Sequence, residues 1–227
     1  RYIRRQRQMC IRDRNLSKQI LFNKEKLDIL SDINIEVEES SSIAITGPSG
    51  SGKSTLLSIL AGLDLPSSGE VFLDNEPLHV LSEEKRAMVR KDSVAFVFQN
   101  FELLPGLTAL ENVMLPLELK AKNKAKDVAI NFLKKVDLLD RTSHYPKQLS
   151  GGEQQRVAIA RAFACEAKVL FCDEPTGNLD SKNSQLVMDL LFDSYKESSS
   201  ALIVVTHDKQ LAAKCDRELE LVDGKVK

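Results

Sequence analysis

A nine-residue run, GPSGSGKST at 47–55, constrains this chain more than any other segment. It fits the pattern G-x-x-x-x-G-K-[ST], in which glycines allow a turn tight enough to aim several backbone N–H groups at one anion. Lys53 is placed to reach the β- and γ-phosphates of a nucleotide, and the Ser54 hydroxyl is placed to bind Mg²⁺. The predicted nucleotide-binding residues are Gly47, Pro48, Ser49, Gly50, Ser51, Gly52, Lys53, Ser54 and Thr55.

The sequence around this loop supports the interpretation. An apolar run at 42–46 predicts a buried strand before the loop, and another at 55–60 predicts a helix after it. The alternative, a Gly/Ser linker that matches by chance, is disfavoured because the motif requires this strand and this helix.

A second run, VLFC at 169–172, is apolar throughout and directly precedes Asp173 and Glu174. Four buried residues predict a strand in the centre of a sheet, and ligands bind at the carboxyl ends of strands in open parallel α/β folds. Asp173 is then the candidate Mg²⁺ partner, and Glu174 is the candidate general base that deprotonates an attacking water. Alone, the pair reads as an ordinary strand end with solvated carboxylates. Because the chain also carries the phosphate loop with Lys53, the catalytic interpretation of Asp173 and Glu174 is favoured.

The segment LSGGEQQR at 149–156 places a hydroxyl and two glycines at the start of a helix predicted to run to about Cys165. A helix N-terminus with free backbone N–H groups is a ready anion site. Because the chain already has one phosphate loop, a second anion site at Ser150, Gly151 and Gly152 suggests a nucleotide bound by a second molecule. In isolation the same residues also read as a simple capped turn.

Taken in order with Gln99 after VAFVF, GNLD at 177–180 and His207 after LIVVT, these segments resemble the nucleotide-binding domain of ATP-binding cassette (ABC) proteins. The resemblance covers about 15–227. It implies an α/β fold: a RecA-like P-loop NTPase core, with a mostly parallel sheet, helices on both sides and a small antiparallel portion, and an inserted α-helical subdomain. The core is expected at about 15–98 and 165–227, and the helical subdomain at about 99–164.

The resemblance also implies an ATPase that binds ATP and Mg²⁺ and works as a homodimer. Gln99 and His207 correspond to the family's γ-phosphate sensors, and Asp180 to its dimer-interface aspartate. The implied catalytic residues are Glu174, His207, Gln99 and Lys53. The implied metal ligands are Ser54, Gln99 and Asp173. The implied contacts to ATP held by the partner subunit are Ser150, Gly151, Gly152 and Gln154.

The chain departs from the family pattern at the adenine site, where the family usually stacks the base on an aromatic residue near the end of the first strand. The matching position here is Ile20, and Phe22 lies close by in the sequence. Either Ile20 or Phe22 is therefore the candidate for contact with adenine.

Apolar residues recur at helical spacing in the middle of the chain and predict helices at 107–119 and 124–139. By resemblance, this helical part carries the groove that receives a short cytoplasmic helix from a permease. Residues 99–105 are expected to line that groove, next to the γ-phosphate sensor Gln99.

Composition limits the classes of function. The chain has 227 residues, a formal net charge of −1 and 29% charged residues, so no overall basic bias points to nucleic acid. Its four cysteines lack C-x-x-C spacing, which favours a reducing compartment over disulfides or a metal site. No run approaches the roughly 18 to 20 apolar residues that span a bilayer, so a transport role would act through a separate membrane protein.

The first 14 residues carry six arginines and one aspartate and lack the apolar alternation of a first strand. Basic tails of this composition are typical of segments that bind anionic lipid or nucleic acid. We instead interpret residues 1–14 as foreign or misread sequence that lies outside the domain.

Within the family, the segments FQNFELLPGLTALENVMLP and DEPTGNLD are most similar to lipoprotein-releasing and macrolide-exporting ATPases (LolD and MacB type), and the closing run is most similar to YbbA-like members. This similarity implies an integral-membrane permease with a MacB/FtsX-like domain as partner, a peripheral place on the cytoplasmic face of the bacterial inner membrane, and no nucleic acid partner.

Other classes of function are less favoured. A non-transport ABC ATPase acting on nucleic acid or ribosomes is the alternative, although such proteins usually carry a zinc insert, a long coiled coil or a second cassette. A GTPase is disfavoured because the nearest run to N-K-x-D, NKAKD at 123–127, has one residue too many. A small-molecule kinase is disfavoured because the SGG segment before the acid pair has no role in a kinase mechanism.

Overall fold

The computed structural model describes residues 9–22 and 25–227. The strands are β1 (Met9–Phe22), β2 (Glu25–Ile33), β3 (Glu36–Glu38), β4 (Ser42–Thr46), β5 (Ser68–Leu73), β6 (Glu76–Pro77), β7 (Val94–Phe98), β8 (Val169–Asp173), β9 (Ala201–Val205), β10 (Arg217–Val222) and β11 (Lys225–Val226). The α-helices are α1 (Lys53–Leu60), α2 (Glu83–Ser93), α3 (Ala109–Leu119), α4 (Ala125–Lys135), α5 (Gly151–Ala164), α6 (Ser181–Lys196) and α7 (Lys209–Ala212). Short 3-10 turns are η1 (Leu78–Val80), η2 (Leu139–Arg141) and η3 (Pro146–Gln148).

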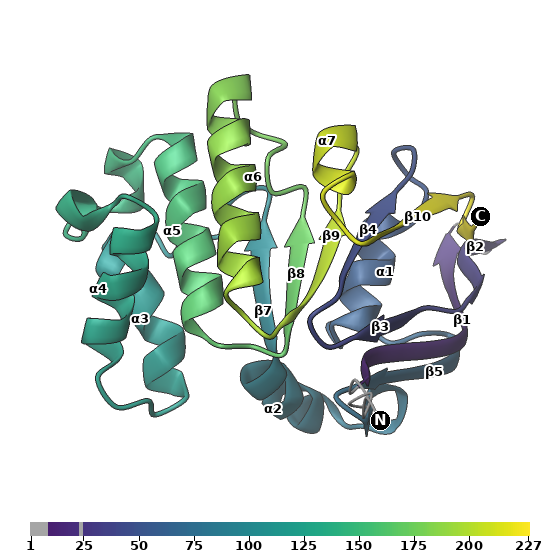
Figure 1. Ribbon diagram of the computed structural model, residues 1–227. Coiled ribbons are helices and arrows are strands. Elements are labelled where there is room, and N and C mark those ends of the chain that lie inside the picture. The colour runs from purple at the N-terminus through teal and green to yellow at the C-terminus, as the bar shows by residue number, and fades with distance from the viewer. Residues whose placement is uncertain (1–8, 23–24) are drawn as a thin grey trace, which may run out of the picture.

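A mostly parallel sheet forms the centre of the molecule, in the order β11-β10-β4-β9-β8-β7. Neighbours from β10 to β7 pair in parallel, and β11 pairs antiparallel to β10. In β8, Leu170 and Cys172 join one apolar cluster, whereas Val169 and Phe171 join the other. The two clusters lie on opposite faces, under α6 and α1 respectively (Figure 1). The expected sheet with helices on both sides is confirmed.

A second sheet is antiparallel, in the order β2-β1-β5-β6, with β3 also paired to β1. It lies beyond α1 at the right of Figure 1. Strand β1 begins at Met9, so residues 9–14 pair within this sheet, whereas the domain was expected to begin at about residue 15. Ile11 is fully buried, and the Asp13 carboxylate accepts a hydrogen bond from the Ile35 N–H at 3.0 Å. Residues 1–8, the rest of that segment, lie outside the described residues.

Helices α3, α4 and α5 pack on one another at the end of the molecule away from the antiparallel sheet (Figure 1). Helix α3 begins at Ala109 and not at residue 107, because the Thr108 hydroxyl accepts the Glu111 N–H at 3.3 Å and caps the helix. Helix α4 ends at Lys135 and not at residue 139, because Asp137 takes a left-handed conformation with φ of 57°. None of the helices in the described ranges is long and apolar enough to cross a membrane.

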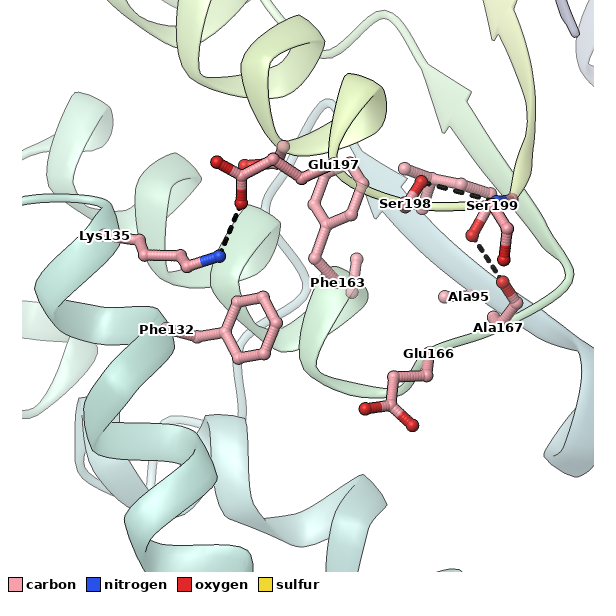
Figure 2. A pocket seen from close by; sticks show the side chains of 13 residues that line it. Ala95, Phe132, Lys135, Phe163, Glu166, Ala167, Glu197, Ser198 and Ser199 are labelled. Carbon is pink, nitrogen blue, oxygen red and sulfur yellow. Dashed lines mark hydrogen bonds and ion pairs between the residues drawn. The ribbon is translucent and has the colours of Figure 1, made fainter. Parts of the chain in front are cut away.

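A cavity of about 380 Å³ lies between α4, α5 and the end of α6. Figure 2 shows the rings of Phe132 and Phe163 on its walls and the ion pair between Lys135 and Glu197, with 2.6 Å between Nζ and Oε2. This ion pair ties α4 to the residue that follows α6. Because both side chains are largely exposed, we expect it to contribute less than about 1 kcal/mol to stability.

Phe171 offers a test of the central sheet. It is fully buried in β8, and its ring stacks on Phe96 of β7 with 5.5 Å between ring centroids. Replacing a buried phenylalanine by alanine leaves a cavity, so Phe171→Ala is expected to lower the free energy of unfolding by about 3–5 kcal/mol in urea denaturation. Val80→Ala is the control, because Val80 is 69% exposed and its change should stay within about 0.5 kcal/mol. A loss no larger than that of the control variant would contradict the packing.

Candidate nucleotide site

The register of the parallel sheet brings the predicted functional segments to one edge. Ile45 of β4 pairs with Val205 of β9, Val205 pairs with Asp173 of β8, and Asp173 pairs with Phe98 of β7. The residues that follow these strands therefore emerge together at the carboxyl edge of the sheet. They are the phosphate loop from Gly47, Thr206 and His207, Glu174, and Gln99.

The phosphate loop joins β4 to α1, as its motif requires. Helix α1 begins at Lys53 and has no side-chain cap, so the N–H groups of its first turn face the loop unpaired by any capping side chain. The Lys53 ammonium donates to the carbonyls of Gly47 and Pro48 at 2.9 and 2.8 Å. This places a positive charge within the loop, where a phosphate would bind.

Two loop glycines are required by their neighbours as well as by backbone conformation. At Gly47, with φ of 142°, an added Cβ would lie 2.1 Å from the carbonyl oxygen of Leu221 in β10. At Gly52, with φ of 100°, it would lie 2.9 Å from the carbonyl oxygen of Ile29 in β2. The sequence motif indicated that these glycines leave room for a phosphate. The structure shows a second reason for glycine, because the backbones of β10 and β2 leave no space for a side chain.

The acid pair lies at the end of β8. Burial raises the pKa of the Asp173 carboxyl, while a hydrogen bond from Ser54 and the charge of Lys53 act to lower it. Asp173 and Ser54 are thus in contact, as the predicted metal site requires. Glu174 leaves the strand in a left-handed conformation with φ of 47°, and its N–H donates to the Val205 carbonyl at 2.9 Å.

His207 lies against Glu174. Its Nδ1 is 2.9 Å from a carboxylate oxygen of Glu174, and the Thr206 hydroxyl lies 3.4 Å from the other oxygen. Because a carboxylate only accepts hydrogen bonds, the Nδ1–H donates in this contact. The Glu174 side chain is 17% exposed and that of His207 is 72% exposed, so the imidazole covers the carboxylate from the solvent side.

Gln99 packs against the turn that follows Glu174. Its Nε2 donates to Oδ1 of Asn178 at 3.1 Å. A Cβ added to Gly177 would lie 2.8 Å from the same Nε2 and 3.4 Å from Cβ of Glu174. The structure therefore brings Gln99 and Glu174 to the same glycine. Asn178 was not singled out from the sequence.

Ser150 caps α5. Its hydroxyl accepts the Glu153 N–H at 3.3 Å, and its own N–H donates to the Glu153 carboxylate at 2.7 Å. This backbone hydrogen bond lowers the pKa of Glu153. Gly152 is buried, and a Cβ there would lie 2.6 Å from Oδ1 of Asn183. Gln154 turns back and donates to the Leu149 carbonyl at 3.1 Å.

The Ser150 segment and the phosphate loop belong to different layers. Helix α5 packs on α3, α4, α6 and β7, whereas α1 packs on β5, β8 and β9. A Cβ added to Gly151 would lie 3.6 Å from the Phe101 ring and 3.7 Å from the Leu179 side chain, so Gly151 packs beside these two residues. The helices that begin at these two predicted anion sites therefore lie on opposite faces of the central sheet.

Asp180 caps α6 and accepts the N–H groups of Lys182 and Asn183, both at 3.1 Å. Its second carboxylate oxygen accepts the Asn183 side-chain amide at 2.5 Å. Asp180 is exposed, so a surface contact is compatible with this capping role. Its predicted place in a dimer interface stays a prediction.

Ile20 is an exposed apolar residue of the β1–β2 hairpin. It pairs directly with Leu27 across the β1–β2 hairpin, and the two residues are 41% and 51% exposed. Farther along β2, Ile29 contacts Gly52. Leu27 is a candidate for adenine contact that the sequence did not suggest, because it depends on the register of the hairpin. The side chain of Phe22 lies outside the described part of the chain.

A phosphate loop between strand and helix, with an acid pair ending a nearby parallel strand, defines a P-loop nucleoside triphosphatase. A sequence profile described as "ABC transporter" matches residues 30–177. The chain belongs to this family, as an ATP-binding subunit of an ABC transporter, and is an ATPase.

Individual relatives agree with this assignment. The chain is 51% identical over 214 residues to an uncharacterized ABC transporter ATP-binding protein, YbbA of Escherichia coli, covering 93% of this chain and 94% of the relative. It is 47% identical over 199 residues to the uncharacterized ABC transporter ATP-binding protein MJ1508 of Methanocaldococcus jannaschii, covering 87% and 88%.

Solved structures agree as well. The ATP-binding cassette MJ0796, in a dimeric post-hydrolysis state bound to ADP and Pi, matches with a TM-score of 0.88 at 40% identity over 96% of both chains. A dimeric structure of MJ0796 described as a bacterial ABC transporter cassette matches with a TM-score of 0.88 at 41% identity, again over 96% of both chains. The expected RecA-like P-loop fold is thereby confirmed.

Lys53→Ala tests the phosphate loop. Losing an ammonium that binds phosphate removes charge-assisted hydrogen bonds, so ATP affinity is expected to fall by about 10- to 100-fold. Titration with a fluorescent ATP analogue measures this, and Lys91→Ala, at an exposed position in α2, is the control. Unchanged affinity in a folded Lys53→Ala protein would contradict the assignment.

Proposed function

We propose that two copies of this chain sandwich ATP, each binding nucleotide at its own phosphate loop and capping the partner's nucleotide with Ser150, Gly151, Gly152 and Gln154. The observation that carries this proposal is that the two helices whose N-termini could bind an anion lie on opposite faces of the central sheet. Helix α1 packs in one apolar cluster and helix α5 in the other. The dimeric state of the MJ0796 cassette supports the same arrangement.

Mg²⁺ fits the residues at the sheet edge. Ser54, Asp173 and Gln99 supply hydroxyl, carboxylate and amide oxygens, which are the ligand types that Mg²⁺ takes together with substrate phosphates. Ser54 already donates to Asp173, so two of the three are adjacent. Ser51 adds a buried hydroxyl without a hydrogen-bond partner in the described part of the chain, which a bound phosphate would satisfy. When bound, Mg²⁺ neutralises phosphate charge during hydrolysis.

Glu174 acts as the general base, and His207 holds it in position. The carboxylate accepts from His207 and lies near the end of the phosphate loop strand through the β8–β9–β4 register. A water that gives its proton to Glu174 would attack the γ-phosphorus of the phosphate held by Lys53, and the bond to the β–γ bridging oxygen would break to release ADP. Gln99, which lies next to Gly177 as Glu174 does, acts as the sensor of the γ-phosphate.

The permease is expected to bind a groove of about 300 Å³ between β7, α3 and α5. Glu102, Leu104, Leu115 and Leu119 are among the residues that line this groove. The groove thus includes part of the predicted 99–105 segment. By sequence similarity we assign the partner to permeases of the lipoprotein-release or macrolide-export type, with a MacB/FtsX-like domain, and we place the subunit on the cytoplasmic face of the bacterial inner membrane without a nucleic acid partner.

Purification from membranes separates this proposal from the alternative, a non-transport ABC ATPase that acts on nucleic acid or ribosomes. Recovery with a multi-helix permease supports transport. Recovery with nucleic acid or ribosomes, and without a membrane protein, supports the alternative.

Glu174→Gln tests the general base. The amide keeps the size of the side chain but does not accept a proton, so turnover is expected to fall by about 10²–10⁴-fold while ATP affinity is retained. With ATP and Mg²⁺ the variant should elute as a dimer in size-exclusion chromatography. Turnover at the wild-type rate would remove Glu174 from the chemistry.

Mixing two inactive variants tests the shared site. Lys53→Ala loses the ammonium that binds the phosphates, and Ser150→Arg loses the contact to the nucleotide of the partner subunit. Neither homodimer should therefore hydrolyse ATP, although Ser150→Arg should still bind it. Mixed at equal amounts, half of the dimers have one intact site, and roughly a quarter of the wild-type rate is expected. Ser82→Arg, which removes the same kind of cap from α2, is the control for Ser150→Arg. No recovered hydrolysis, with mixed dimers demonstrably formed, would contradict the shared site.

A further inference from the structure

The turn between Glu174 and Asp180 carries a polar side chain that the proposed mechanism does not use. The Gly177 N–H donates to the Glu174 carbonyl at 3.0 Å, and the Leu179 N–H donates to the Thr176 carbonyl at 3.1 Å. These hydrogen bonds fold the turn directly onto the general base. Asn178 lies in this turn and contacts Gln99 and Asn100, the two residues that follow β7.

Asn178 and Gln99 face each other as a pair of amides. Gln99 Nε2 donates to Asn178 Oδ1 at 3.1 Å, and Asn178 Nδ2 donates to the Gln99 backbone carbonyl at 3.1 Å. Asn178 Nδ2 also donates to Oδ1 of Asn100 at 2.9 Å. One side chain thereby fixes both the backbone and the amide group of Gln99.

This geometry sets which atom of Gln99 is available to a metal. An amide has one carbonyl oxygen and one NH₂ group, and Mg²⁺ binds only the oxygen. Because Nε2 is bound to Asn178, the Oε1 atom is the one left for other ligands. Gly177 allows the contact, since any side chain there would start 2.8 Å from Nε2.

We propose that Asn178 is a positioning residue that holds the Gln99 amide with its oxygen available to Mg²⁺. It acts through Gln99 and does not itself touch the nucleotide. The proposal rests on the proposed role of Gln99 as a metal ligand. Through Gln99, it also links the turn that ends in Asp180, at the proposed dimer interface, to the proposed metal site.

Mn²⁺ binding tests this without turnover. The full chain is mixed with a non-hydrolysable ATP analogue, and bound Mn²⁺ is measured by electron paramagnetic resonance. Losing a residue that orients a metal ligand typically weakens metal affinity by 10- to 100-fold, so Asn178→Ala is expected to lose Mn²⁺ affinity by about that factor. In steady-state assays the half-saturating Mg²⁺ concentration should rise by a similar factor, with kcat at saturating Mg²⁺ retained.

Two further variants sharpen the test. Asn178→Asp keeps the acceptor for Gln99 Nε2 but loses the donor to Gln99 and Asn100, so its loss of Mn²⁺ affinity should be smaller than that of Asn178→Ala. It also replaces Asn178→Ala if that variant does not fold. Asn123→Ala, at an exposed position between α3 and α4, should bind Mn²⁺ as the wild type does.

Gln99→Ala separates failure of this proposal from failure of the proposed metal site. If Gln99→Ala weakens Mn²⁺ binding and Asn178→Ala adds nothing further in the double variant, Asn178 acts through Gln99 as proposed. If Gln99→Ala weakens binding but Asn178→Ala matches the wild type, only the role of Asn178 is overturned. If neither variant changes Mn²⁺ affinity, the metal role of Gln99 is overturned as well.

Discussion

The parallel register of β4, β9, β8 and β7 is the constraint on which the site depends. A slip of one residue would turn every side chain of a strand to the opposite face of the sheet. In β8 such a slip would exchange Phe171 and Cys172 between the two apolar clusters and would move Asp173 away from Ser54. Burial on both faces therefore fixes the carboxylates relative to the phosphate loop, and the same packing that stabilises the sheet sets the geometry of the chemistry.

The turn after β8 connects the two halves of the site. Gln155 of α5 is fully buried, and its Nε2 donates to the Pro175 carbonyl at 2.6 Å, one residue beyond Glu174. The Oε1 atom of Gln155 has no hydrogen-bond partner in the described part of the chain. Burying this oxygen costs free energy, which the hydrogen bond from Nε2 to Pro175 partly offsets. Helix α5 is capped by Ser150, in the segment proposed to contact the partner's nucleotide. A buried hydrogen bond thus joins the helix that carries this proposed cap to the residue after Glu174, the proposed general base.

Sequence alone predicted the parts of this structure that depend on local pattern. The apolar runs at β4 and β8 and the phosphate-loop motif identified the strands, the helix after the loop and the candidate residues Lys53, Asp173 and Glu174. Helix ends shifted where capping decides them, at Thr108 and at the left-handed Asp137. Residues 1–14 were set aside because they are rich in arginine and lack the apolar alternation of a first strand, yet Ile11 is fully buried and Arg12 packs over the Phe72 ring at 4.6 Å. Asn178 was missed because its partner Gln99 lies 79 positions away in the chain.

The segment after Gln99 lies between the proposed metal site and the proposed permease groove, and Arg161 of α5 donates two hydrogen bonds to it. Phe101 and Glu102 both adopt left-handed conformations, with φ of 64° and 48°, which cost energy in residues other than glycine. Arg161 of α5 offsets this cost by donating to their carbonyls at 2.9 and 2.6 Å. Since Glu102 and Leu104 line the groove, a helix bound there would press on a segment with little freedom to absorb the displacement. The movement would therefore be shared between Gln99, at one end of the segment, and α5, which carries the proposed cap for the partner's nucleotide.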